Sequence, residues 1–329
     1  MIMHKLLSKI REVVHQRWDQ KVGVDILLAV YNSSQYVSET IESIIRQDFT
    51  QWRLLIRDGG SKDHTPHIIE KYAQAHPDKI VLIPSVKRSG ACQNFSALLS
   101  RSLASYVMFC DHDDIWLPGK ISKSLSLMRE QEQLLGAEVP LLLFTDKRVV
   151  DDKLSVISDS YNEYQNLNSE NLQLSRLLVQ NVPSGCTMLI NRALIDKCGT
   201  IPPGAIMHDH WISLTAAAFG KIIYLDEPTI LYRQHIRNVF GASQYGLRYF
   251  YHLFSKGLNA ARRRFYQNVE QARLFLEHFE GQLSAADAEV LLAFSSLQEC
   301  SWTKRRRILW RYKILKTGIC RNIGMFLIV

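Results

Sequence analysis

Apolar and polar positions follow two alternating patterns over the first part of the chain. Residues 26–30 form a continuous apolar run that ends in Tyr31 and Asn32, which is typical of a strand buried on both faces. The pattern continues as a helix at 36–47, a strand at 53–57, a helix that begins at Thr65 and Pro66, a strand at 80–83, a helix at 94–103 and a strand at 106–110. This alternation predicts an α/β fold with parallel strands, whose ligands bind beyond the carboxyl ends of the strands.

The pattern is less regular after Pro118. Helical spacing continues to about residue 133 and returns at 172–179 and 211–219, whereas the segments at 140–146, 186–190, 222–225 and 230–233 are strand-like. From residue 245 the spacing is helical almost to the end, and residues 1–20 fit a short amphipathic helix. We therefore expect an α/β domain over residues 1–242 and a helical extension over residues 243–329.

Composition and charge narrow the class of protein. With 47% apolar and 22% charged residues among 329, the chain is too apolar to be disordered. The net charge is +8, yet the last 29 residues carry eight basic side chains and no acidic one, while residues 1–240 carry equal numbers of both. A uniformly basic nucleic-acid-binding protein would not distribute its charge this way, so we expect no nucleic-acid partner.

Cysteine spacing and hydropathy bear on location. The six cysteines lie far apart along the chain, so no close pair suggests a zinc or redox site, and we expect reduced thiols. No apolar run reaches the ~18 residues that cross a bilayer, and charged residues interrupt the apolar positions of the N-terminus, unlike in a signal peptide. These patterns predict a cytoplasmic protein that is still able to contact a membrane surface.

Three carboxylates follow the strand at 106–110 directly, in the order Asp111, His112, Asp113 and Asp114. Like charges this close raise one another's pKa, and a divalent cation is the usual means of neutralising them. The D-x-D spacing of Asp111 and Asp113 can present oxygens to one hard cation such as Mg²⁺ or Mn²⁺, which commonly binds substrate phosphates. The alternative interpretation is a solvated acidic turn.

Two further segments suit an anionic ligand. The loop at 58–65 joins a strand to a helix through Gly59 and Gly60, which allow a ligand to approach the backbone closely. Arg233 and His235 follow the last strand-like segment and offer hydrogen-bond donors. The sequence contains neither the glycine motif of dinucleotide-binding folds nor that of P-loop proteins, which argues against an oxidoreductase or an NTPase.

Asp209 stands between two histidines, His208 and His210, just before a predicted helix. It is a candidate catalytic base. Two other interpretations stay open, because His-x-His spacing also occurs in zinc sites and an aspartate at this position can cap a helix.

These segments occur in an order that resembles the family 2 glycosyltransferases of the GT-A fold, and particularly a bacterial branch similar to the rhamnosyltransferases of surface polysaccharide synthesis. The matching segments are 27–32, 58–63, 111–114, 208–211 and 233–235. The resemblance covers about residues 24–242. It implies a catalytic GT-A domain with a mixed, mostly parallel sheet, followed by the helical extension.

The resemblance also implies residue roles on the donor side. The nucleotide base would lie against Ala29, Tyr31 and Asp58, and the rest of the nucleotide would lie near Arg88 and Gly90.

Further roles concern the cation and the leaving group. Asp111 would lie at the ribose and, with Asp113 and His235, at a divalent cation. Arg233 and His235 would contact the diphosphate as it leaves.

On the acceptor side, Asp209 would remove the proton of the attacking hydroxyl. Asp114, His210 and Trp211 would form the acceptor pocket.

The implied activity is inverting, metal-dependent transfer of a sugar, L-rhamnose from a dTDP donor, onto a glycan or lipid-linked acceptor. Two alternatives stay open. One is a UDP-hexose transferase of the same fold, and the other is a non-catalytic module that binds a sugar nucleotide or a glycan. The second arises because Gly59 stands where the family usually has a second acid. The residues do not distinguish Mg²⁺ from Mn²⁺.

The end of the chain combines cations with an apolar seam. Apolar residues at 308, 312, 315, 319, 323 and 326 are spaced for one helix over residues 302–326. This pattern predicts a basic helix that lies on the inner face of the cell membrane. The alternative is a helix packed on the body or on a partner, which includes an oligomer formed through the helical tail.

Overall fold

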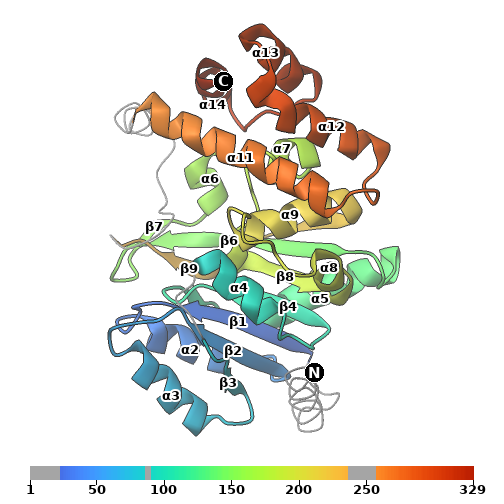
Figure 1. Ribbon diagram of the computed structural model, residues 1–329. Coiled ribbons are helices and arrows are strands. Elements are labelled where there is room, and N and C mark those ends of the chain that lie inside the picture. The colour runs from blue at the N-terminus through green and yellow to red at the C-terminus, as the bar shows by residue number, and fades with distance from the viewer. Residues whose placement is uncertain (1–22, 86–89, 236–256) are drawn as a thin grey trace.

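The computed structural model describes residues 23–85, 90–235 and 257–329 (Figure 1). One sheet crosses the middle of the molecule, and its strands are β1 (Val24–Val30), β2 (Trp52–Asp58), β3 (Ile80–Leu82), β4 (Tyr106–Cys110), β5 (Ile115–Trp116), β6 (Leu141–Val150), β7 (Val156–Ser158), β8 (Met188–Asn191) and β9 (Lys221–Arg233). Within the described residues the strand order is β3-β2-β1-β4-β8-β6-β9-β5, and β7 pairs with β6.

The first half of the sheet confirms the predicted alternation. β1 pairs in parallel with β2 and β4, and β2 pairs in parallel with β3. Every residue of β1 is buried, as expected for a strand covered on both faces. The connecting helices are α2 (Val37–Ile45), α3 (Thr65–Ala75) and α4 (Ala91–Leu99). The carboxyl ends of β1, β2 and β4 therefore lie at one edge of the sheet.

The second half of the sheet is mixed. β8 runs antiparallel to β4 and β6, β6 runs parallel to β9, and β5 runs antiparallel to β9. The sequence predicted two strands at 222–225 and 230–233, whereas the structure has the single strand β9. The register of β6 and β9 shifts beside Pro228, because proline lacks the N–H needed for regular pairing. The proline interrupts the strand pattern in the sequence, which is why two strands were predicted.

Helices cover both faces of this half of the sheet. They are α5 (Lys120–Leu135), α6 (Tyr161–Gln165), α7 (Leu174–Leu177), α8 (Arg192–Cys198) and α9 (His208–Phe219), with a 3-10 turn, η1 (Gly185–Thr187), before β8. α9 packs against β6, β9, α4, α7 and α8. Its position matters because Asp209 lies in its first turn.

The C-terminal part forms a helical layer above α9 (Figure 1). It contains α11 (Leu258–His278), α12 (Ala285–Ser295), a 3-10 turn, η2 (Ser296–Glu299), α13 (Trp302–Arg311) and α14 (Ile319–Ile328). The predicted single helix over 302–326 is wrong. Lys313 and Gly318 adopt left-handed φ angles of 53° and 87°, which end one helix and begin the next.

One hydrophobic cluster runs from the sheet into the helical layer. It includes Phe109 of β4, Trp211 of α9, Phe275 of α11 and Met325 of α14. The C-terminal helices therefore share their core with the α/β part. The predicted boundary near residue 242 and the predicted helix at 1–20 lie outside the described residues.

A buried ion pair fixes the register of the first two strands. Asp25 of β1 is the direct neighbour of Arg53 of β2, and the guanidinium donates two hydrogen bonds of 2.9 Å to its carboxylate. The carboxylate also accepts from the hydroxyl of Ser102 and from the backbone N–H groups of Leu103 and Ala104 before β4. Three segments of the sheet thus depend on one buried carboxylate.

We expect Asp25→Ala to lower the free energy of unfolding by about 3–5 kcal/mol, because it leaves the buried Arg53 guanidinium without its counter-charge. Urea denaturation followed by circular dichroism measures the change. The control is Asp196→Ala, which removes an exposed carboxylate paired with Arg192 and should cost less than about 1 kcal/mol. Equal stability of the two variants would contradict the assignment.

Candidate active site

The loops after β1 and β2 are joined by hydrogen bonds at the carboxyl edge of the sheet. The backbone N–H of Asn32 donates to Oγ of Ser61 at 2.8 Å, and the backbone N–H of Lys62 donates to Oδ1 of Asn32 at 2.8 Å. The carboxylate of Asp58 accepts from the backbone N–H of Ser61 at 3.0 Å. The backbone N–H of Gly59 donates to the carbonyl of Val30 at 2.8 Å. The two loops therefore form one cross-linked unit.

Four of the five residues predicted on the nucleotide side lie within the described chain. Tyr31 is 37% exposed just after β1, whereas Ala29 is buried within the strand. Asp58 is half-buried in the cross-linked loop, and Gly90 caps α4. Arg88 lies outside the described residues.

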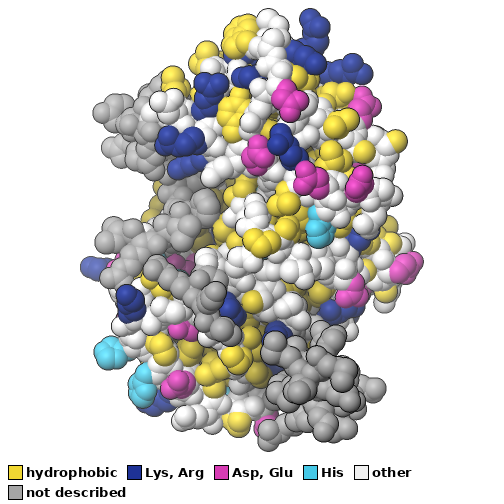
Figure 2. Space-filling model, viewed as in Figure 1, with side chains coloured by type: hydrophobic (Ala, Val, Ile, Leu, Met, Phe, Trp, Pro, Cys, Tyr) yellow, Lys and Arg dark blue, Asp and Glu magenta, His cyan; other side chains and the backbone are white. Residues whose placement is uncertain are grey.

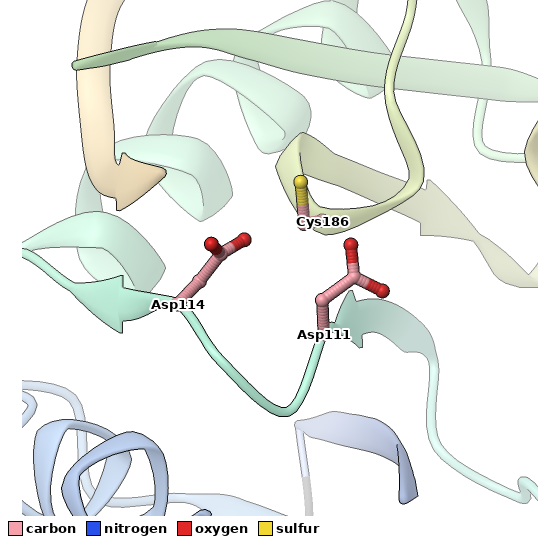
Figure 3. Close-up of side chains that lie close together, drawn as sticks. All are labelled: Asp111, Asp114 and Cys186. Carbon is pink, nitrogen blue, oxygen red and sulfur yellow. The ribbon is translucent and has the colours of Figure 1, made fainter. Parts of the chain in front are cut away.

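Asp111 and Asp114 converge on Cys186 (Figure 3), and a ligand atom from each lies within 4.8 Å of the others. Burial, followed by the charge of Asp113, raises the pKa of Asp111 to about 6. The same two causes raise the pKa of Asp114 well above its ordinary value. Burial also raises the pKa of the Cys186 thiol, which therefore stays protonated at neutral pH.

Lys147 of β6 brings a buried positive charge to this cluster. Its ammonium lies 3.9 Å from the ring centres of Tyr161 and Tyr232 and donates to Oγ of Ser184 at 3.0 Å. Burial opposes the charge, but the interactions with Cys186, Tyr161, Asp114 and Asp111 raise the pKa of Lys147 above its ordinary value. The aromatic rings hold this cation in place.

Asp113 has a different partner from Asp111 and Asp114. Its Oδ2 lies 2.9 Å from Nε2 of His235, although the two residues are 122 positions apart. The imidazole of His235 stacks on Tyr36, with ring centres 4.8 Å apart and planes inclined by 16°. Two of the three predicted metal ligands are therefore adjacent.

Arg233 connects several segments around the site. Its Nε donates to the carbonyl of Asp113 at 3.1 Å, another guanidinium nitrogen donates to the carbonyl of Asp152 at 3.0 Å, and the third forms an ion pair with Glu39. Its backbone N–H donates to Oδ1 of Asp114 at 3.2 Å. We call residues 111–114 the acidic loop. The guanidinium is thus held beside the acidic loop by Glu39 of α2 and by the carbonyl of Asp152.

The donor atoms of the site fit a hard divalent cation. Oδ2 of Asp114 is buried without a hydrogen-bond partner among the described residues, so negative charge in this loop is not fully balanced. Carboxylate oxygens suit Mg²⁺ and Mn²⁺, whereas the protonated thiol of Cys186 is a poor ligand for either. Among the described residues, the ligand atoms that come together are those of Asp111, Asp114 and Cys186. The predicted set of Asp111, Asp113 and His235 is not gathered in this way, since Asp113 is hydrogen-bonded to His235 instead.

Asp209 is fixed at the start of α9. Its carboxylate accepts from the backbone N–H of His210 at 2.7 Å and from that of Gly185 at 3.2 Å. A Cβ at Gly185 would lie only 2.7 Å from Nε2 of His208, so this close approach requires glycine. After burial and Asp113, the charge of Asp209 is among the causes that raise the pKa of Asp111. The candidate base and the acidic loop therefore share one electrostatic environment.

His208 lies beside Asp209, and its ring packs against two phenylalanines that also contact each other. Its centroid is 4.0 Å from that of Phe95 and 5.1 Å from that of Phe109. Burial lowers the pKa of His208 to about 4, which keeps the imidazole neutral. Neither ring nitrogen has a hydrogen-bond partner in the described part of the chain. These features do not suit a general acid near neutral pH.

Three residues predicted to form the acceptor pocket are enclosed by protein. Asp114 and Trp211 have no exposed surface, and His210 is 7% exposed. The ring of His210 is held between the carbonyl of Leu177 at 2.7 Å and the side-chain amide of Gln271 at 2.9 Å. These side chains can shape a pocket from behind, but in this structure they do not present a surface to an acceptor.

A cavity of about 760 Å³ opens next to the loop that leads to Asp209. Its walls are the loop at Gly204–Ile206, the first turns of α11 and η2, and they include Arg262, Arg263 and Tyr266. The backbone N–H of Ile206 donates to Gln271 of α11 at 2.7 Å. The cavity is therefore built on the same helix that holds His210.

The sequence analysis did not identify Tyr36, Glu39 or Lys147 as site residues. Tyr36 and Glu39 belong to a segment with ordinary helical spacing, and only the fold brings them to Arg233 and His235. Lys147 lies just beyond the predicted strand at 140–146. A lysine followed by the apolar residues Val149 and Val150 was the one available signal that β6 continues.

Without a divalent cation, Asp111 should make stability depend on pH. Its folded-state pKa of about 6 is above the usual value, so its favourable contribution is complete at low pH and is lost as the pH rises through 6. In EDTA, the melting temperature of the wild type relative to Asp111→Asn should therefore fall between about pH 4 and pH 6.5 and stay constant above that range. Differential scanning fluorimetry measures this difference, and a constant difference would contradict the raised pKa.

The chain matches the family model described as Glycosyl transferase family 2 over residues 25–199, which is more than half of its length. The dTDP-rhamnosyl transferase RfbG of Shigella flexneri is 26% identical over 229 residues, which cover 66% of this chain and 74% of RfbG. Two Bacillus subtilis relatives are matched over 44% and 42% of their own length, so the chain spans less than half of each.

Solved structures share the fold. Staphylococcus aureus TarS 1-349 in complex with UDP-GlcNAc has a TM-score of 0.56 and 18% identity, covering 88% of this chain and 80% of TarS. The mannosyltransferase PcManGT of Pyrobaculum calidifontis, in complex with GDP-Man and Mn²⁺, has a TM-score of 0.51 and 17% identity, covering 93% of each chain. The expected GT-A fold with C-terminal helices is confirmed.

Proposed function

Because this chain belongs to glycosyltransferase family 2, we propose that it transfers L-rhamnose from a dTDP donor, with inversion, onto a glycan or lipid-linked acceptor in bacterial surface polysaccharide synthesis. The similarity to RfbG supports the donor. The nucleotide sugars named for TarS and PcManGT support the donor class only. The family and the cavity lined by Arg262 and Arg263 support the proposed acceptor class.

In this proposal the donor base lies against the loops after β1 and β2. Tyr31 offers an exposed ring for stacking, and Asp58 accepts hydrogen bonds within a loop that Asn32 and Ser61 hold in shape. Ala29 forms the floor at the end of β1, and Gly90 lies at the start of α4. The cross-linked loop supplies this geometry although Gly59 replaces a usual acid.

Asp111, Asp113 and His235 would hold Mg²⁺ or Mn²⁺. The cation would neutralise the charge that develops on the leaving diphosphate. Arg233 supports the same task, since its guanidinium is held beside the loop by the carbonyl of Asp113. The Mn²⁺ named for PcManGT is compatible with this set. Lys147 balances part of the charge of the acidic loop.

Asp209 acts as the general base. It takes the proton of the acceptor hydroxyl while the hydroxyl oxygen attacks the anomeric carbon, and the bond to the diphosphate breaks on the opposite face. The observation that supports this role is its placement: the carboxylate is fixed by Gly185 at the start of α9 and lies near enough to Asp111 to affect its pKa.

His210 and Trp211 then act as positioning residues. They anchor α9 through Leu177, Gln271 and the core, and so they fix Asp209. Asp114 orients the backbone of Arg233 from within the loop.

The acceptor would enter through the cavity lined by Arg262 and Arg263, whose charges suit the phosphates of a lipid-linked acceptor. No helix among the described residues is both long and apolar enough to span a bilayer. We place the reaction at the inner face of the cell membrane, where such an acceptor and a cytoplasmic nucleotide sugar meet.

We expect Asp209→Asn to reduce sugar transfer by about two to four powers of ten, because the amide cannot accept the proton. Donor binding should survive, since the change leaves the acidic loop intact. Nucleotide diphosphate release measures transfer, and isothermal titration with the sugar nucleotide measures binding. Asp196→Asn is the matched control on the surface of α8 and should keep full activity. Full activity of Asp209→Asn would remove it from the mechanism.

A panel of dTDP- and UDP-sugars with Mn²⁺ or Mg²⁺ tests the donor. We expect dTDP-rhamnose to give the fastest nucleotide diphosphate release in the presence of acceptor glycans, and EDTA to abolish release. Faster release from a UDP-hexose would favour the UDP-hexose transferase. Donor binding without turnover for any acceptor would favour the non-catalytic module.

A further inference from the structure

The last two helices expose an apolar stripe each. On α13, Trp302 and Trp310 are eight positions apart, and on α14, Ile319, Ile323 and Leu327 follow one another at intervals of four. Residues at these intervals lie on one face of a helix. All five side chains are between 55% and 79% exposed, whereas Met325, on the opposite face of α14, is buried. We call these five residues the apolar face.

α13 and α14 are held together, which places their two stripes at the same end of the molecule (Figure 1). Arg306 lies between the two tryptophans along α13 and stacks on Trp302, with its guanidinium carbon 3.4 Å from the ring centre. The same guanidinium donates to the carbonyls of Phe326 and Val329 at the end of α14. The two helices are thus joined at the apolar face itself.

Exposed cations lie on α13 and in the turn that joins it to α14. Lys304 and Arg307 are exposed on α13, and Lys313 is exposed in the turn that follows. Arg311 is also exposed but forms a pair of 3.7 Å with Glu289 of α12. Figure 2 shows Lys and Arg side chains beside hydrophobic ones at this end of the molecule. Residues 301–329 themselves contain no acidic side chain, so Lys304, Arg307 and Lys313 leave an excess of positive charge on this surface beside Glu289 of α12.

We infer that the apolar face binds an anionic lipid bilayer, with Trp302, Trp310 and the α14 stripe inserted at the interface and these exposed cations on lipid phosphates. Tryptophan prefers the boundary between headgroups and acyl chains, and in-plane amphipathic helices combine an apolar face with cations in this way. A second copy of the chain would bring two positively charged surfaces together, which favours lipid as the occupant. The inference extends the proposed function, because a lipid-linked acceptor would lie in the same membrane.

Vesicle co-sedimentation of the full chain tests this. We expect binding to phosphatidylcholine vesicles that contain phosphatidylglycerol, and at least tenfold weaker binding to phosphatidylcholine alone. Lys304→Glu with Arg307→Glu should reduce binding to the anionic vesicles at least tenfold, as expected when two surface cations are reversed. Trp310→Ser with Ile319→Ser should do the same without reversing any charge.

The matched control is Leu103→Ser with Leu134→Ser, which removes two exposed leucines from the α/β part and should leave vesicle binding unchanged. Equal vesicle binding by the wild type and the Trp310/Ile319 variant would overturn the inference. The inference would also be overturned if the wild type formed a concentration-dependent dimer but did not bind vesicles, and the Trp310/Ile319 variant did not form this dimer.

Sugar transfer to a soluble acceptor analogue separates this inference from the proposed function. The Trp310/Ile319 variant should keep full transfer in that assay, since it alters no residue of the candidate active site. Vesicle binding without transfer would leave the inference standing and count against the proposed function. Transfer without vesicle binding would support the proposed function and count against the inference.

Discussion

Three carboxylates at the end of a buried strand are the constraint on which the rest of the site depends. Asp111, Asp113 and Asp114 follow β4 with little access to water, so each needs a partner of opposite charge or a donor. The fold supplies these from elements far apart in the sequence: Lys147 from β6 and Arg233 from β9. The mixed half of the sheet brings both strands beside this loop. The order of the strands therefore determines which cations lie near the carboxylates.

The helical layer is a second condition for the site. α11 holds His210 through Gln271 and holds the loop before α9 through Ile206, so the position of Asp209 depends on a helix more than 50 residues later in the chain. The basic C-terminal residues, which in the sequence resemble a separate appendage, belong to helices that pack into the same core through Met325. The layer therefore supports the candidate base as well as providing an outer surface.

The sequence predicted those features that depend on residues close together along the chain. The apolar run of β1 and the strand-to-helix loops revealed the parallel half of the sheet, and the acids after β4 revealed the site. Contacts between distant segments were not predictable from spacing, which is why Tyr36 and Lys147 were missed. The break between α13 and α14 was missed as well, because a left-handed residue such as Lys313 interrupts a helix without interrupting its apolar period.

α9 and α14 are connected through α11, which contacts α14 and packs Phe275 against Trp211 of α9. The start of α9 carries Asp209, and the exposed side of α14 carries Ile319 and Ile323, while Trp211 and Met325 belong to one hydrophobic cluster between them. This packing sets how far the carboxylate of Asp209 lies from the exposed side of α14. With α14 on a membrane, Asp209 would reach acceptor hydroxyl groups at one distance from the bilayer. Glycans that place their hydroxyl groups nearer or farther would be poor acceptors.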